Sequence, residues 1–404
     1  MSVSFPWSSA GLCALLCALG WGGVAHGVAM GAEPGLPDQV RRALDENASA
    51  LSPLRVTWEQ TRSSPWTVSQ VLAKLKMPDT ARDVMAPQKV EVKLQGNKFY
   101  VHYWRSMAQA EAHSKGGPRS DLPLLLVEQE VAFDGSKFYN GSPGRLDGAQ
   151  QGDANVHIEG IERIVQPPGD RVLADPVYFY MAGFRVPSTA RDWTSARPKS
   201  LLQSVLDQGG KIGGVREERL GEEAVLSVEV LKEGEKTVFA LDPAKRYALR
   251  RRTAWYPSGS LAATVDCLDF VRLQDPDLWL PKRIEVDQHV DKDPQLLMHD
   301  TYAVSVVSRA PIAPEELAVS YKAPGSWVTD DTIPGAEGLK EGKVTYRVPA
   351  SAEELDEAIA LAMGKVPQRA PLSRSILALN VVALAILLVV VLYWRIRRSK
   401  TARA

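Results

Sequence analysis

Cysteine is scarce in this chain of 404 residues, which contains three. Cys13 and Cys17 lie in an apolar run at the amino end, so Cys267 is left alone in the remainder. An intramolecular disulfide is therefore excluded there, and stability must come from a buried core. An excess of charge is also missing, because 48 basic side chains balance 48 acidic ones. The composition thus gives no support to nucleic acid as a partner.

Recognisable catalytic and metal-binding motifs are missing as well. The six histidines include no pair at the H-E-x-x-H spacing of zinc enzymes, and no G-x-S-x-G elbow occurs. His289 and His299 are near Asp291, Asp293 and Asp300 in the sequence, which we interpret as a solvated loop between two strands. The glycine-rich segment 209–214 lacks P-loop spacing and is interpreted as a flexible turn. We therefore expect no catalytic residues, no metal, no cofactor and no enzyme. A hydrolase assembled from distant residues is the third functional hypothesis.

Long hydrophobic runs occur at the two ends of the chain. The first lies within residues 1–31 and is followed by small residues, which predicts a secretory signal peptide; because no lysine or arginine precedes Arg41, an uncleaved anchor is the alternative. The second, Ile376–Trp394, is long enough for a transmembrane helix. The tail 395–404 is rich in arginine, and the positive-inside rule places it in the cytoplasm. We expect a single-pass protein of the inner (cytoplasmic) membrane, with its ectodomain facing the periplasm or exterior.

Between these ends we expect one folded domain, residues 33–331, followed by a linker and stalk, residues 332–375. From Ala224 to Val307, short alternating apolar and polar segments are separated by turn residues, which predicts a meander of about six antiparallel strands. Further strands are predicted before residue 140, and helices from their apolar spacing at Leu36–Leu51 and Lys199–Asp207. The predicted fold class is α+β, mainly β.

Aromatic side chains along the predicted strands are the candidates for a ligand site. Strand Lys98–Trp104 carries aromatic residues on both faces, which is typical of a strand covered on both sides, although one side could meet a ligand. Arg250–Arg252 place charge on both faces of another strand, either to pair with Asp266 or Asp269 or to bind an anionic head group. The candidate ligand-binding residues are Trp58, Phe99, Val101, Tyr103, Tyr178, Phe179, Arg251 and Trp255.

Three short motifs resemble the outer-membrane lipoprotein carrier and receptor superfamily (LolA/LolB-like). They are Phe133-Asp134-Gly135-Ser136-Lys137, Leu278-Trp279-Leu280-Pro281-Lys282-Arg283-Ile284 and Tyr321-Lys322-Ala323-Pro324-Gly325. The resemblance covers about residues 37–331 and implies a curved antiparallel sheet, an incomplete β-barrel, whose apolar concave side is covered by short helices and receives acyl chains. It brings no catalytic residues.

These observations lead to two non-enzymatic hypotheses. The first is a membrane-tethered envelope protein that binds an acyl chain, a lipoprotein or another apolar ligand in the concave face of the sheet. The alternative is a partner-binding or sensory envelope protein that uses the same fold without a lipid. The expected partners are the membrane, a lipid or lipoprotein, and an envelope protein. The chain departs from shuttle members of the superfamily, because an anchored protein cannot diffuse between membranes.

Overall fold

The structure is a computed structural model that describes most of the chain between residues 35 and 365. The described ranges are 35–77, 82–107, 125–142, 155–160, 177–186, 197–317, 319, 324–336, 339 and 342–365. The expected signal peptide (1–31), transmembrane helix (376–394) and basic tail (395–404) lie outside them. Within the described ranges, no helix is both long and apolar enough to cross a membrane.

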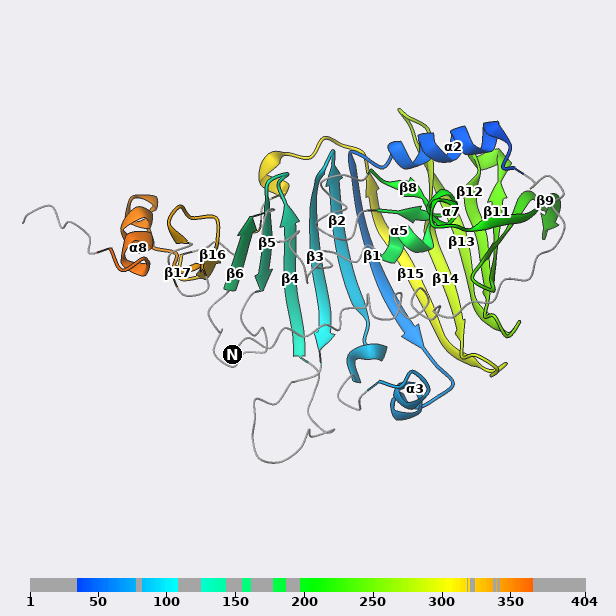
Figure 1. The fold of residues 1–404 in the computed structure, drawn as a ribbon, viewed down its shortest axis with the longest axis horizontal. Coiled ribbons are helices and arrows are strands. Elements are labelled where there is room, and N and C mark those ends of the chain that lie inside the picture. Colours follow the sequence, from blue (N-terminus) through cyan, green and yellow to red (C-terminus); the bar gives the residue numbers. More distant parts are fainter. Residues whose placement is uncertain are drawn as a thin grey trace, which may run out of the picture.

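The described part of the chain is dominated by a single sheet of 15 strands (Figure 1). In chain order the strands are β1 (Leu54–Ser63), β2 (Gln88–Gln95), β3 (Lys98–Met107), β4 (Leu125–Phe133), β5 (Lys137–Ser142), β6 (Asn155–Gly160), β9 (Lys211–Leu220), β10 (Glu223–Lys232), β11 (Glu235–Asp242), β12 (Ala248–Trp255), β13 (Leu261–Leu273), β14 (Leu278–His289), β15 (Leu296–Ser308), β16 (Trp327–Asp330) and β17 (Val344–Arg347).

The order of strands in space shows how the sheet is assembled from two runs. The order is β17-β16-β6-β5-β4-β3-β2-β1-β15-β14-β13-β12-β11-β10-β9. The first run, β1 to β6, and the last run, β9 to β15, are joined where β1 pairs antiparallel with β15. The described neighbours pair antiparallel except β16 and β6, which are parallel. Consecutive strands therefore pair mostly through hairpins, as the alternating sequence predicts.

The helices are short and lie around this sheet. They are α2 (Asp38–Ser49), α3 (Val68–Lys74), α5 (Val177–Met181), α7 (Leu201–Asp207) and α8 (Leu355–Ala362), together with the 3-10 turns η1 (Arg82–Met85), η2 (Pro243–Lys245), η3 (Pro314–Leu317) and η6 (Ala352–Glu354). In α2, Val40, Leu44 and Ala48 recur every four residues and are buried, so this helix presents one apolar stripe to the sheet. In α3, Thr67 and Gln70 form a capping box at the start.

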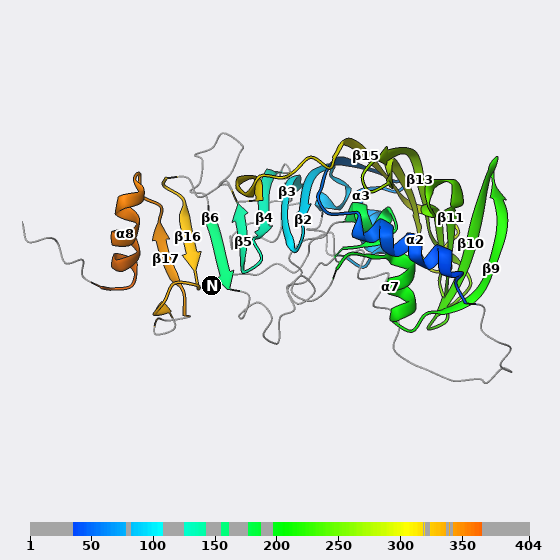
Figure 2. The same cartoon turned by 90° about the horizontal axis from the view of Figure 1, so that it is seen from above.

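The two faces of the sheet are buried by different elements. α2, α5 and α7 lie over one face of its β1 and β9–β15 half, and the sheet curves around them (Figure 2). We call this the covered face; Trp58, Val101, Val228, Val265 and Ile284 belong to its large apolar cluster. On the opposite face of β3–β6, a smaller cluster contains Tyr100 and Ile158 and is completed by Ile312, Leu317 and Val319. Strand β3 is thus packed on both faces.

The sequence predictions for the fold are largely confirmed. The six strands of the meander are β10–β15, and the predicted helices and the predicted strand Lys98–Trp104 (β3) are present. The mainly-β fold class with a large open sheet is confirmed, whereas the transmembrane helix lies outside the described residues.

Two predictions need correction. Residues 211–214 are not a turn but the start of β9, because Lys211 to Gly214 pair with β10. The sheet also continues past the expected boundary at residue 331, since β17 pairs with β16.

Candidate functional site

The covered face of the sheet is closed by a small unit that contains two of its helices. We call this unit the cover: residues 177–186 and 197–208, with α5, the ribbon β7 (Phe184–Arg185) and β8 (Lys199–Ser200), and α7. The ribbon joins the two helices, because Phe184 pairs with Ser200 and Arg185 with Lys199. The Arg185 side chain also donates to the Ser204 hydroxyl at 3.0 Å. The cover therefore has internal hydrogen bonds that do not involve the sheet.

An aromatic cluster lies where α5 meets β1. The rings of Trp58 and Tyr178 stack with centroids 5.3 Å apart, and Phe179 meets Trp58 edge-on at 6.5 Å. These three side chains are almost fully buried. On the neighbouring strands, Phe99 packs near Phe133 with ring centroids 6.1 Å apart. Six of the eight predicted site residues belong to this one buried apolar cluster: Trp58, Phe99, Val101, Tyr103, Tyr178 and Phe179.

Few polar contacts anchor α5 to the sheet. The Tyr178 hydroxyl donates to the backbone carbonyl of Pro281 at 2.8 Å, and complete burial raises the pKa of this hydroxyl well above its ordinary value. The Cys267 thiol donates a weak hydrogen bond to the Met181 carbonyl at 3.5 Å. Burial raises the pKa of the Cys267 thiol to about 12, so it is an inert thiol while α5 covers it. Most of the attachment of α5 is therefore apolar packing.

Gly183 allows the cover to approach the sheet closely. Its φ is +92°, a conformation that side chains with a Cβ rarely adopt, and a Cβ added there would lie 2.8 Å from Cβ of Leu249 on β12. Its carbonyl accepts from the backbone N–H of Leu201 at 2.7 Å, which ties α5 to the start of α7. A larger residue at this position would hold the cover away from β12.

The described side chains pack closely where α2 and the cover meet β11 and β12. A cavity of about 10 Å³ lies there, lined by side chains such as Leu44, Phe184, Phe239 and Leu249. That volume suffices for about one water molecule and is far too small for an acyl chain. Any ligand on this face must therefore replace part of what now covers it.

The remaining two predicted site residues lie elsewhere. Arg251 binds Asp266 through two hydrogen bonds of 2.6 and 3.0 Å and is 40% exposed, which confirms the predicted cross-strand pairing. Trp255 is partly buried under the ammonium group of Lys236, 4.4 Å from the ring centroid. Neither residue joins the aromatic cluster.

The arginine that reaches the covered face is Arg252, which sequence reasoning missed. Strict alternation from the buried Leu249 would turn Arg251 inward. However, the β11–β12 register shifts by one residue: Leu241 pairs with Leu249, but Ala240 pairs with Arg251. This bulge inserts Arg250 and so turns Arg252 toward the cover. β12 contains no glycine or other turn residue from which the bulge could be predicted.

Two of the resemblance motifs have structural roles. In the β4–β5 turn, the Asp134 carboxylate accepts from the backbone N–H groups of Ser136 and Lys137 at 2.8 and 2.7 Å and from the Tyr139 hydroxyl at 2.8 Å. Burial opposes ionisation of Asp134, but these hydrogen bonds outweigh it and lower the pKa of its carboxyl below the usual range. In the second motif, Pro281 supplies the carbonyl that accepts from Tyr178.

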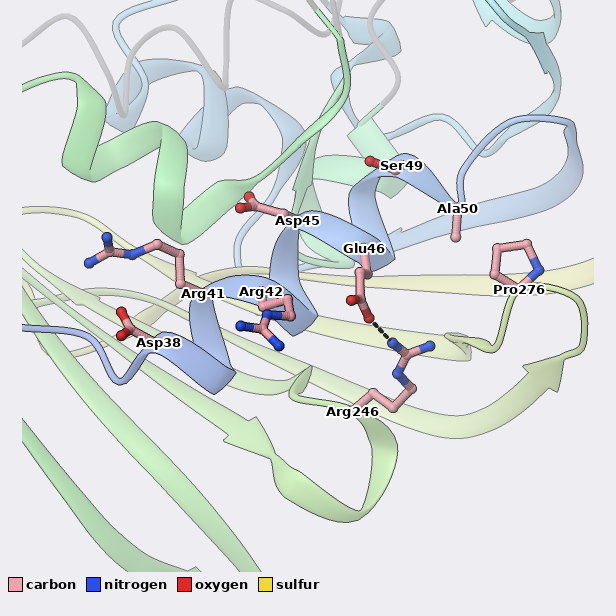
Figure 3. Close-up of a pocket in the computed structure, with 9 residues that line it drawn as sticks. All are labelled: Asp38, Arg41, Arg42, Asp45, Glu46, Ser49, Ala50, Arg246 and Pro276. Carbon is pink, nitrogen blue, oxygen red and sulfur yellow. Dashed lines mark hydrogen bonds and ion pairs between the residues drawn. The ribbon is translucent and has the colours of Figure 1, made fainter.

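A second hollow lies on the outer side of α2. It is a surface groove of about 680 Å³ between α2 and the turns at Arg246 and Pro276 (Figure 3). Arg246 pairs with Glu46 of α2 and donates to the Asp277 carbonyl at 2.8 Å. Three arginines and three acidic residues line the groove, so their charges cancel: Arg41, Arg42, Arg246, Asp38, Asp45 and Glu46. It offers no net charge to a ligand.

Of the acidic residues near His289 and His299, Asp287 contacts His299 Nδ1 at 2.7 Å, and two others pair with basic side chains. Asp293 pairs with Lys74 at 2.6 Å, and Asp300 accepts from Arg62 at 2.5 Å. Across the described ranges, no group of three histidine, cysteine, aspartate or glutamate side chains could hold a metal ion.

Comparisons with known proteins give structural neighbours alone. No protein-family model and no curated protein matches the sequence. Among solved structures, the fold is similar to a LolA superfamily protein from Nitrosomonas europaea (TM-score 0.34, 10% identity, 70% of this chain and 98% of that chain). It is also similar to a putative outer membrane lipoprotein-sorting protein domain from Vibrio parahaemolyticus (TM-score 0.32, 10% identity, 69% of this chain and 94% of that chain). A third neighbour is a DUF1329 family protein from Desulfovibrio piger (TM-score 0.29, 10% identity, 70% of this chain and 95% of that chain). These neighbours include the superfamily that the motifs resemble.

Proposed function

We propose that this chain is a membrane-tethered envelope protein that binds an acyl chain, a lipoprotein or another apolar ligand on the covered face of its sheet. The observation that carries the proposal is the nature of the covering. Strands β1–β5 and β10–β15 contribute a continuous apolar face. The cover, which contains α5 and α7 and has hydrogen bonds of its own, packs on this face. Such a unit can move as one piece, because its internal hydrogen bonds do not depend on the sheet.

Burial of a ligand offsets part of the cost of displacing the cover. An acyl chain gains about 0.8 kcal/mol for each methylene that it buries, so a dozen methylenes supply roughly 10 kcal/mol. Displacing α5 costs apolar contacts of the same kind and one strong hydrogen bond, from Tyr178 to Pro281. Because one apolar surface replaces another, the net cost of opening is smaller than the gross contact area suggests.

The tether in this proposal is the apolar segment Ile376–Trp394. With the signal-like start and the basic tail, it would hold the folded domain on the outer side of the inner membrane. A protein fixed in this way would receive or present an apolar ligand at one membrane, and would not carry it between two.

A partner-binding or sensory protein without a lipid is the second candidate, and the close packing beneath the cover favours it. The cavity of about 10 Å³ between α2, the cover and β11–β12 is too small for an acyl chain. If the cover never leaves the sheet, the fold acts as a rigid scaffold and its outer surface is the functional part.

The test is the lipid content of the purified protein. The full chain would be extracted into an amphipathic polymer and its lipids quantified by mass spectrometry. An unrelated soluble protein fused to residues 366–404 provides the matched control for lipid held by the membrane segment. One additional lipid per chain, relative to the fusion, is the expected result. Equal lipid content in both preparations would refute a lipid-binding face and leave the partner-binding candidate.

A further inference from the structure

Arg252 is a cation on the covered face of the sheet. It lies on β12 between Phe239 of β11 and Val265 of β13, which are its cross-strand partners and belong to the buried apolar cluster. Arg252 is 7% exposed. A guanidinium group cannot lose its charge at physiological pH, so this position keeps a full positive charge in an apolar surrounding.

Arg252 has no anionic partner among the described residues. Its Nη2 donates to the Met181 thioether sulfur at 3.6 Å, and its guanidinium carbon lies 4.5 Å from the ring centroid of Tyr180. Both partners belong to α5. The adjacent arginines of β12 differ, because Arg250 pairs with Glu223 and Arg251 with Asp266, each at 2.6 Å.

A buried cation held by a thioether and an aromatic ring is poorly compensated. Sulfur is a weak acceptor, and among the described residues the Met181 sulfur is the one hydrogen-bond acceptor of the Arg252 guanidinium. A charge that is buried without a counter-ion is strongly unfavourable. The planar guanidinium group can pair with a carboxylate or a phosphate through two parallel hydrogen bonds. Arg252 therefore offers a carboxylate or phosphate a guanidinium without an anionic partner, next to an apolar surface.

We propose that Arg252 binds the oxyanion, carboxylate or phosphate, of an anionic amphiphile whose apolar chain lies on the covered face. This inference rests on the proposed function and names the chemical class of its ligand. Displacement of α5 removes Met181 and Tyr180 from the guanidinium, and the head group of the ligand takes their place. The same arginine then selects an anionic amphiphile over a neutral one.

The experiment compares a fluorescent fatty acid with its uncharged ester. The full chain in an amphipathic polymer would be titrated with cis-parinaric acid and with its methyl ester, and the signal of the polymer alone subtracted. The proteins are the wild type, Arg252→Gln and, as a matched control, Arg251→Gln. We expect Arg252→Gln to weaken binding of the acid by about tenfold or more, the effect of losing charge-assisted hydrogen bonds. Binding of the ester should stay unchanged, and Arg251→Gln should match the wild type.

A second variant and a competitor keep the test decisive. Arg252→Met fills the same space with an apolar chain, so it should fold and also lose the preference for the acid. Equal affinity of the wild type for acid and ester, or equal effects of Arg252→Gln and Arg251→Gln, would overturn the role of Arg252. Displacement of the acid by excess inorganic phosphate would overturn the proposal that the ligand is an amphiphile, because a free oxyanion would then occupy the site. If neither acid nor ester binds, the proposed function itself fails.

Discussion

The close approach of Gly183 to β12 allows a direct test of whether the cover can leave the sheet. In Gly183→Ala the added Cβ meets Leu249 Cβ at 2.8 Å, and the φ of +92° is unfavourable for alanine. Gly209 is the matched control, because its φ is +91° and a Cβ there meets nothing within 4 Å. Both variants carry the backbone cost of about 1–2 kcal/mol. Only Gly183→Ala adds the clash, which costs about 1–3 kcal/mol by the usual effect of overpacking.

The thiol of Cys267 reports the position of the cover. It is fully buried and lies 3.5 Å from the Met181 carbonyl of α5, with its pKa raised to about 12 by burial. Alkylation therefore requires opening, and its rate follows the open population when reclosing is fast. The full chain would be treated with a neutral maleimide and the Cys267 peptide quantified by mass spectrometry.

The expected outcome is faster alkylation of Cys267 in Gly183→Ala than in Gly209→Ala. An added cost of about 1–3 kcal/mol in the closed state corresponds to roughly a fivefold to hundredfold higher rate. Circular dichroism should show the same strand content in both variants. Equal rates in the two variants would refute the reasoning that the contact between Gly183 and Leu249 holds the cover in place.

Three further predictions follow from the same contacts. Tyr178→Phe removes the hydrogen bond to Pro281 and should raise the alkylation rate of Cys267 about fivefold, for a loss of about 1 kcal/mol. Tyr139→Phe loses a hydrogen bond of equal length, 2.8 Å, far from α5, and should leave that rate unchanged; equal effects would contradict the assignment. Above pH 9.0, unfolded Cys267 releases a proton that the folded state keeps until its pKa of about 12. Stability is therefore full below pH 9 and should fall above it by up to about 1.4 kcal/mol per pH unit, measured in urea. In Cys267→Ala the free energy of unfolding should fall less steeply above pH 9. Parallel plots of this free energy against pH for the two proteins would refute the role of the thiol. A chain of residues 35–365 should unfold cooperatively, and one ending at 342 should melt at a lower temperature because β17 no longer pairs with β16; equal midpoints would show that β17 adds nothing.

Local patterns were sufficient to predict most of the fold. The meander β10–β15 has alternating apolar residues between turn residues, and α2 has the spacing of an amphipathic helix, so their periods identify them. β9 escaped prediction because its two glycines and mixed charges give no alternation, and it is an edge strand with a mostly exposed surface. β17 is four residues long, too short to show a period.

The candidate site was predictable in its aromatic part and not in its charged part. Trp58, Tyr178 and Phe179 could be named because large aromatic side chains are usually buried together. Their contact with one another depends on how α5 folds back on β1, which no local pattern specifies. The orientation of Arg252 depends on a one-residue bulge between β11 and β12, and such a bulge reverses which side chains face the interior.

Hydrogen exchange of α5 with and without an apolar ligand tests the central claim most directly. The helix α5 has only five residues, so its backbone N–H groups lose protection when it no longer packs against the sheet. The N–H of Ala182, which donates to the Tyr178 carbonyl at 2.8 Å, is one of them. With saturating cis-parinaric acid methyl ester on the full chain, peptides of α5 should exchange faster while those of β10 and β11 keep their protection. If the ester binds and α5 keeps its protection, the ligand does not replace the cover, and the account given for the covered face is wrong.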